Sequence, residues 1–247
     1  MKTSRKSLYI PGACIFFVGI LLGLILSGWS LWAEVEASIM VFRTGDQDIS
    51  NLRCPLMLAS AETGTVSASF DNPTAEIINP TVQATINHVG VPRTETTVLT
   101  IAPGEKKSVQ WVVGPGDKVF GGLVLINVFE SSQRDFPSHQ GSCGIPISSF
   151  PGLSGIQAFV LIFAFAQVAM AGGTGLWLVG HSRLKGLAAN ATNASVALTG
   201  FVFVDMLFIF STWWGMGLLF FFLAIMLIVI IVTQFILFPT SADRGES

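Results

Sequence analysis

The sequence predicts a membrane protein with four transmembrane helices and one β-sandwich, which is inserted between the first and second helices. Three observations indicate this fold class. Of the 247 residues, 51% are hydrophobic and only 11% are charged, whereas soluble domains carry roughly a quarter charged residues. Four long runs contain almost no charge. One polar segment, residues 34–150, lies between the first run and the other three.

The first apolar run extends from Leu8 to Ala33, after a basic segment that contains Lys2, Arg5 and Lys6. Its 26 residues exceed the roughly 20 that a helix needs to cross a bilayer. A cleaved signal peptide is the alternative, because small residues in Val35-Glu36-Ala37 fit a cleavage site. The run is far longer than the roughly 7–15 apolar residues of signal peptides, so we expect residues 1–33 to be an uncleaved anchor.

Small residues recur every fourth position in this first helix, at Gly19, Gly23 and Ser27. This spacing places them on one helical face, where they allow close approach of a neighbouring helix. General tolerance of glycine in membrane helices is an equally good explanation. The glycine-rich stretch 171–175 lies within the second apolar run, where we expect it to provide close packing or a kink.

The polar segment, residues 34–150, has the alternation of β-strands. Apolar residues occupy every second position in three stretches, which predicts strands with one buried face; the residues expected inside are Val66, Ala68, Phe70, Val82, Ala84, Ile86, Val109, Trp111 and Val113. Residues 123–126 are apolar on both faces and predict a central strand. Turn pairs such as Asn72-Pro73 and Pro103-Gly104 separate the strands. About seven short strands at this spacing predict an antiparallel sandwich, and we expect 131–149 to form a loop.

Two stretches of this segment resemble a known class of module. Asn79-Pro80-Thr81-Val82-Gln83-Ala84-Thr85-Ile86 is followed, after a spacer, by Leu99-Thr100-Ile101-Ala102-Pro103-Gly104-Glu105-Lys106-Lys107-Ser108-Val109. This order of an N-P strand, a P-G-E turn and an alternating strand resembles the immunoglobulin-like or fibronectin-like modules of bacterial surface proteins. The resemblance covers residues 64–130 and implies an immunoglobulin-like sandwich outside the cytoplasm. It carries no functional residues.

Cysteine positions indicate one disulfide. Cys54 and Cys143 lie near the two ends of the polar segment, whereas Cys14 lies in an apolar run. In an oxidising compartment a Cys54–Cys143 bridge closes a loop of about 90 residues, which is worth up to roughly 4–5 kcal/mol in the chain-entropy estimate. Two free thiols are the alternative, which would suit the cytoplasm. The segment holds twelve acidic and seven basic residues, which gives no basis for nucleic-acid binding.

The remaining runs predict a second helix over 151–180, a loop over 181–193, a helical hairpin over 194–238 and a tail over 239–247. The hairpin must turn within Trp213–Gly217, and Trp213 and Trp214 are expected to sit at the membrane–water interface. Basic residues precede the first helix and lie in the 181–193 loop, so both termini are expected in the cytoplasm and residues 34–150 outside. Glycosylation sequons begin only at Asn190 and Asn193, on the inner side, which favours a bacterial inner membrane.

Asp205 is the acidic residue nearest the middle of a predicted transmembrane helix. An acid there costs roughly 2.5–3.5 kcal/mol on insertion scales, so it must be protonated or partnered. Gln167 lies at a similar depth in the second helix, and we expect the two side chains to share a hydrogen bond. The bond either joins two helices or forms part of a proton or cation relay.

No sequence motif assigns a catalytic activity. Nucleophile elbows, zinc-protease signatures and phosphate-binding loops are missing from the sequence, and its three histidines lack the neighbours that a metal site needs. We therefore expect no catalysis, no metal and no cofactor. The predicted function is that of an accessory or structural subunit, with membrane lipids and other membrane subunits as partners. A small transporter that uses Asp205 is the alternative, and a surface glycan- or peptide-binding module is a weaker one.

Overall fold

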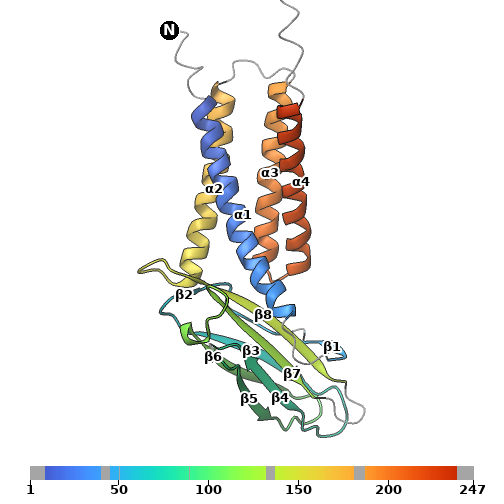
Figure 1. Cartoon of the computed structure of the whole chain (residues 1–247). Coiled ribbons are helices and arrows are strands. Elements are labelled where there is room, and N and C mark those ends of the chain that lie inside the picture. The colour runs from blue at the N-terminus through green and yellow to red at the C-terminus, as the bar shows by residue number, and fades with distance from the viewer. Residues whose placement is uncertain are drawn as a thin grey trace, which may run out of the picture. The chain divides into compact units, whose positions relative to one another are not determined.

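The structure of the chain is a computed structural model that describes residues 9–39, 45–49, 51–88, 90–131, 137–180 and 187–237 (Figure 1). The chain divides into two compact units. One unit is a helical bundle that comprises Met1–Gly28 and Leu161–Ser247, and the other is a β module that comprises Trp29–Val160. The β module therefore includes the last turns of the first helix and the first turns of the second. It extends beyond the predicted insert, residues 34–150, at both ends.

Four long apolar helices are present, as the sequence predicted: α1 (Tyr9–Ile39), α2 (Gly155–Gly180), α3 (Leu187–Phe210) and α4 (Trp214–Leu237). Within the described residues, each contains a stretch long and apolar enough to cross a membrane. Two of the ends differ from the prediction. α1 continues past Ala33, because Glu34, Glu36 and Ala37 are compatible with a helix and no glycine or proline ends it there. α3 begins at Leu187, before the expected residue 194.

The turn between α3 and α4 lies at Ser211–Trp213, and not at Trp213–Gly217 as predicted. Thr212 adopts a left-handed conformation with φ of 62°, and the Trp213 backbone N–H donates to the Phe208 carbonyl at 2.9 Å. Gly215 and Gly217 are inside α4 instead. Thr212 ends α3 in the left-handed conformation that a glycine normally adopts at a helix end. The position of the glycines in the sequence therefore did not mark the turn.

Two β-sheets form the body of the β module. Their strands are β1 (Gln47–Asp48), β2 (Leu58–Ala59), β3 (Gly64–Asp71), β4 (Thr81–Ile86), β5 (Arg93–Val98), β6 (Lys106–Val113), β7 (Leu123–Glu130) and β8 (His139–Ser148). The larger sheet has the order β1-β8-β7-β4-β5, with β2 also paired to β8, and the smaller sheet pairs β3 with β6. A short 3₁₀ helix, Pro115–Asp117, precedes β7.

Both sheets contribute to one shared hydrophobic core, which supports a two-layered β arrangement. The residues that the sequence predicted to be inside are buried there: Val66, Ala68, Phe70, Val82, Ala84, Ile86, Trp111 and Val113, with Val109 partly buried. β7 is buried on both faces over residues 123–126 and lies between β8 and β4. The prediction of a central strand is therefore confirmed.

The predicted loop over 131–149 is wrong for most of its length, because residues 139–148 form the ten-residue strand β8. Its Gly, Ser and Pro content obscured it, although Ile145 and Ile147 are buried in the shared core. β8 pairs antiparallel with β7 along eight positions. At its two ends it pairs in parallel with β1 and β2, so the larger sheet is mixed and not purely antiparallel.

Small residues allow the close approach of helices inside the bundle. A Cβ added at Gly19 would lie 2.8 Å from the Ala166 carbonyl oxygen, and one at Gly23 would lie 2.8 Å from a methyl group of Val202. A Cβ at Gly12 would lie 2.9 Å from the Gly173 carbonyl oxygen. The small-residue face of α1 therefore packs against α2 and α3 of the same chain, and Gly173 provides the close packing expected of the 171–175 stretch.

Candidate functional site

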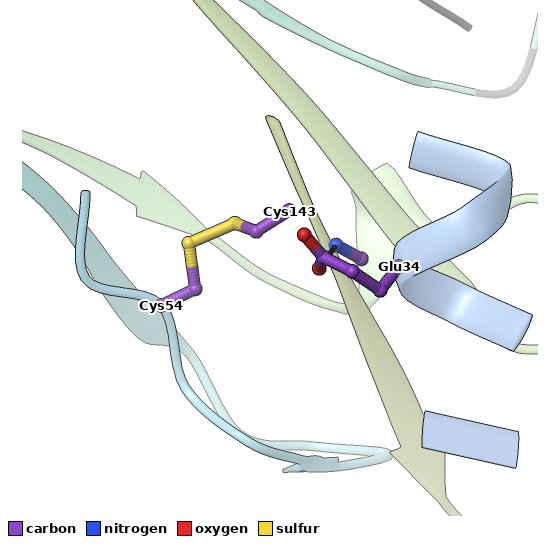
Figure 2. Close-up of a disulfide and its surroundings, with 4 residues drawn as sticks. Glu34, Cys54 and Cys143 are labelled. Atoms are coloured by element: carbon purple, nitrogen blue, oxygen red, sulfur yellow. Dashed lines mark hydrogen bonds between the residues drawn. A yellow bond between two sulfur atoms is a disulfide. The ribbon is translucent and has the colours of Figure 1, made fainter. Parts of the chain in front are cut away.

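The predicted disulfide is present and joins two parts of the β module that are distant in sequence. Cys54 and Cys143 are 89 positions apart, and their Cα atoms lie 6.6 Å apart. Cys143 lies in β8 and is buried, whereas Cys54 precedes β2 in an irregular segment. Figure 2 shows the bridge with the Glu34 side chain of α1 directed toward the backbone beside Cys143. The bridge therefore lies next to the place where α1 meets the sheet.

The end of α1 packs directly on β8 at Gly144. The Gly144 backbone N–H donates to Glu34 Oε2 at 3.2 Å. A Cβ at Gly144 would collide with the Ala33 carbonyl group, so only glycine permits this approach of helix to strand. Ala33 and Ala37 are fully buried in a small apolar cluster with Leu123 and Leu125 of β7. Small residues on both surfaces thus bring the helix into contact with the sheet.

The start of α2 is attached to the β module by a buried contact and three polar side chains. The backbone N–H groups of Ala59 and Gly155 both donate to Glu62 Oε2, at 2.9 and 2.6 Å. A carboxylate there is favourable, because the first N–H groups of a helix lack partners and carry partial positive charge. A Cβ at Gly155 would collide with the Met57 carbonyl group, which again requires glycine.

Ser154 and Gln157 complete this helix start as a capping box. The Gln157 backbone N–H donates to Ser154 Oγ at 3.3 Å, and the Ser154 backbone N–H donates to Gln157 Oε1 at 3.0 Å. Reciprocal bonds of this kind satisfy two donors that the helix leaves free. Ser-x-x-Gln ahead of an apolar run is a recognised sequence signal, so these two residues were identifiable from the sequence.

The two attachments are linked through the disulfide and the β2–β8 pairing. Cys143 is adjacent to Gly144, which contacts α1, and Cys54 is three positions before Met57, which contacts α2. Leu58 pairs with Ile147 in the same region. One covalent bridge and one short parallel pairing therefore hold together the two backbone segments against which the helix ends pack. We call this group of residues, Glu34, Cys54, Glu62, Cys143, Gly144 and Gly155, the helix junction.

Asp205 is completely buried in the helical bundle, but it does not bond to Gln167. Neither carboxyl oxygen of Asp205 nor the amide nitrogen of Gln167 has a hydrogen-bond partner among the described residues. The Ser27 hydroxyl group, which is also fully buried, lies beside the Asp205 carboxyl group. The two groups do not form a complete hydrogen bond. The predicted Asp205–Gln167 hydrogen bond is therefore wrong, and Ser27 of α1 is the polar neighbour that sequence depth alone did not identify.

A second group of polar residues lies where β7 ends and β8 begins. Glu130 and His139 are opposite each other in the ladder, and His139 Nδ1 lies 2.8 Å from Glu130 Oε2. Burial raises the pKa of Glu130, and the neighbouring His139 opposes this effect. Hydrogen bonds from Ser138 lower the pKa of Asp46.

Within the described part of the chain, no group of three or more His, Cys, Asp or Glu side chains is arranged to hold a metal ion.

Other predicted residues are placed as follows. Trp213 is 64% exposed and stacks on Phe208, and Trp214 begins α4. Trp111 is buried in the hydrophobic core that the two sheets share, so it does not contribute to a surface aromatic cluster. The basic residues used to orient the chain lie outside the described residues; they are Lys2, Arg5, Lys6, Arg183 and Lys185. The side chain of Asn190 and the tail over 239–247 also lie outside them.

Comparison with known proteins assigns no family. No family model matches the chain, and no curated protein matches its sequence. Solved structures match the fold only weakly. A Paenibacillus sp. cycloisomaltooligosaccharide glucanotransferase matches with a TM-score of 0.33 and 17% identity, over 43% of this chain and 15% of that chain. A Bacteroides uniformis β-glucuronidase matches with a TM-score of 0.30 and 13% identity, over 39% and 12%.

A CARDB domain from Pyrococcus furiosus, solved in complex with di-metal ions, matches with a TM-score of 0.33 and 13% identity, over 45% of this chain and 100% of that chain. The chain thus spans only 15% and 12% of the lengths of the two enzymes. Likeness at this level supports no statement about activity, ligand or metal.

Proposed function

We propose that the protein is a non-catalytic membrane subunit that displays an immunoglobulin-like module on the outer face of the cell membrane for assembly with other membrane proteins. The observation that carries this proposal is the helix junction. Within the module, the end of α1 packs against Gly144, and Gly155 at the start of α2 packs against Met57. A module that is built onto the ends of two apolar helices in this way is suited to display a surface for assembly.

The proposed topology places four helices across the bilayer, both termini in the cytoplasm and residues 34–150 outside. The four helices have the length and hydropathy that spanning requires. The basic residues of the sequence favour an inner position for both termini. The Cys54–Cys143 disulfide agrees with this orientation, because such bonds persist in oxidising compartments.

The transport alternative gains no support from the bundle. It requires a water-filled route to Asp205, with Gln167 and Thr199 beside it. Asp205 is fully buried, and the apolar cavity of about 350 Å³ that the described residues of the bundle enclose is lined by none of these three residues. We therefore assign Asp205 a structural role, in which it contacts Ser27 between α3 and α1.

Two experiments test the proposal. Membrane-impermeant thiol reagents applied to intact cells should label cysteines engineered at exposed positions of the module, such as Thr97, and should not label cysteines placed at Ser4 or Ser241. Amine-reactive cross-linking in membranes, gentle detergent extraction and mass spectrometry should then recover defined membrane-protein partners. Labelling of the chain ends from outside would contradict the topology, and a chain that is always isolated alone would contradict the assembly role.

A further inference from the structure

A cavity of about 350 Å³ lies within the helical bundle and is lined by residues from all four helices. Gly12 of α1 and Gly173 of α2 lie on its wall, with Trp177 of the same helix. α3 contributes Ser195 and α4 contributes Ile228. The volume falls in the range of roughly 300–1,000 Å³ that is usual for pockets that hold small molecules.

The lining selects an apolar occupant. Most of the lining side chains are apolar, and the two hydroxyl groups are already used within their own helices. Thr174 Oγ1 donates to the Met170 carbonyl at 2.8 Å, and Ser195 Oγ donates to the Thr192 carbonyl at 2.9 Å. A water molecule needs two to four polar partners to be stable in a cavity, and with both hydroxyl protons already donated this lining offers water few partners. An empty apolar space of this size would forfeit the dispersion contacts of its walls.

The position of the cavity along the helices indicates the class of the occupant. It adjoins the first turns of α1, at Gly12–Phe17, and the last turns of α2, at Gly173–Trp177. In the sequence, these are the helix ends next to the basic residues Arg5, Lys6, Arg183 and Lys185. Clusters of Lys and Arg beside a membrane helix favour anionic lipids.

We propose that this cavity binds one acyl chain of an anionic membrane phospholipid. The inference rests on the proposed insertion of the four helices into a bilayer. The acyl chain fills the space between the four helices, beside the close contact of Gly12 with Gly173, and its headgroup lies toward the cytoplasmic side. Bound lipid thereby replaces the contacts that a tightly closed bundle would make by itself.

The test measures lipid retained by the full-length protein. The protein is reconstituted in vesicles of phosphatidylcholine with a minority of phosphatidylglycerol, floated on a density gradient, extracted in mild detergent and weighed by native mass spectrometry. The wild type should float and should retain one phosphatidylglycerol per chain in preference to phosphatidylcholine. Failure to float would contradict the membrane proposal itself, whereas flotation without retained lipid would overturn the lipid site alone.

Matched variants locate the site. Ala13→Phe and Ser195→Phe fill the cavity from α1 and from α3, and Ala171→Phe adds the same ring at an exposed position of α2 that does not line the cavity. The two cavity variants should lose retained lipid by roughly tenfold or more, and Ala171→Phe should retain it. Equal retention by all three variants would overturn the site. Equal retention of both lipids by the wild type would overturn the preference for an anionic lipid.

One further outcome distinguishes a protein occupant. A wild-type dimer without bound lipid, converted to a monomer by Ala13→Phe, would show that a second copy fills the cavity, and would overturn the lipid proposal. Where one cavity variant does not fold, as judged by loss of flotation or of the Cys54–Cys143 bridge, the other cavity variant still locates the site by comparison with Ala171→Phe.

Discussion

Replacement of Gly144 by alanine is the sharpest test of the helix junction. The added Cβ would collide with the Ala33 carbonyl group, which belongs to a continuous helix, and not with a side chain that could rotate away. Accommodation requires α1 and β8 to separate. That movement would disturb the buried cluster of Ala33, Ala37, Leu123 and Leu125 and lengthen the hydrogen bond from Gly144 to Glu34.

The cost follows from the kind of atoms that collide. Overpacking of a well-packed core costs about 1–3 kcal/mol, and a clash of the added Cβ with a backbone carbonyl group lies at the upper end of that range. The alanine recovers about 0.4–1 kcal/mol by restricting the unfolded chain. We therefore expect a net loss of about 2 kcal/mol in the free energy of unfolding, which lowers the thermal midpoint of a module of this size by about 5–10 °C.

Gly141→Ala is the control, because it makes the same substitution in the same strand. A Cβ at Gly141 would lie 3.1 Å from a methyl group of Leu52 and 3.2 Å from Ile49 Cβ. Small side-chain shifts relieve these contacts, so we expect a change within about 1 kcal/mol of the wild type. Both variants are compared in the same detergent by thermal unfolding followed by tryptophan fluorescence. Equal midpoints for Gly144→Ala and Gly141→Ala would refute the close approach of α1 to β8.

Three further predictions concern the disulfide and two of the buried acidic residues, Asp205 and Glu130. The Cys54→Ser, Cys143→Ser double variant should lose up to about 4–5 kcal/mol of module stability, since the bridge closes a loop of 89 positions; thermal unfolding with and without a dithiol reductant measures this. Asp205→Asn should change the thermal midpoint by less than the equivalent of about 1 kcal/mol, because the amide keeps the shape of a buried side chain without adding charge. The module should become less stable as pH rises above 4.5, the ordinary pKa of Glu130, because burial raises the pKa of Glu130 in the folded state, which then holds more protons than the unfolded state. Glu130→Gln should reduce this dependence of the thermal midpoint on pH, measured by thermal unfolding across a pH series.

Each of these has a contradicting result. A reductant that lowers the midpoint of the serine double variant as much as that of the wild type would show that the bridge is not the cause. Loss of a proton- or ion-dependent activity in Asp205→Asn would restore the transport alternative. A pH slope that survives in Glu130→Gln would assign the titration to another group.

Much of the architecture follows from local patterns in the sequence. Long apolar runs predicted four helices, because a backbone in an apolar environment must satisfy its own hydrogen bonds. Alternation at Val66–Phe70 and Val82–Ile86 predicted strands that the structure contains. Two cysteines at the ends of one polar segment predicted the disulfide. The helices and strands are predicted from patterns among neighbouring residues, and the disulfide is predicted from the positions of two cysteines.

The tertiary structure alone decided which backbones come close together. β8 escaped prediction because its Gly, Ser and Pro content resembles that of a loop, and it is a strand because β7 lies beside it along eight positions. Glycine is required at positions 144 and 155 because the backbones of Ala33 and Met57, which are distant in sequence, pack against them. Asp205 lies beside Ser27 and does not bond to Gln167, because the rotation of each helix about its axis decides which side chains meet, and depth along the helix does not. Local sequence determines the period of an element, whereas its neighbours are determined by packing among all of the elements at once.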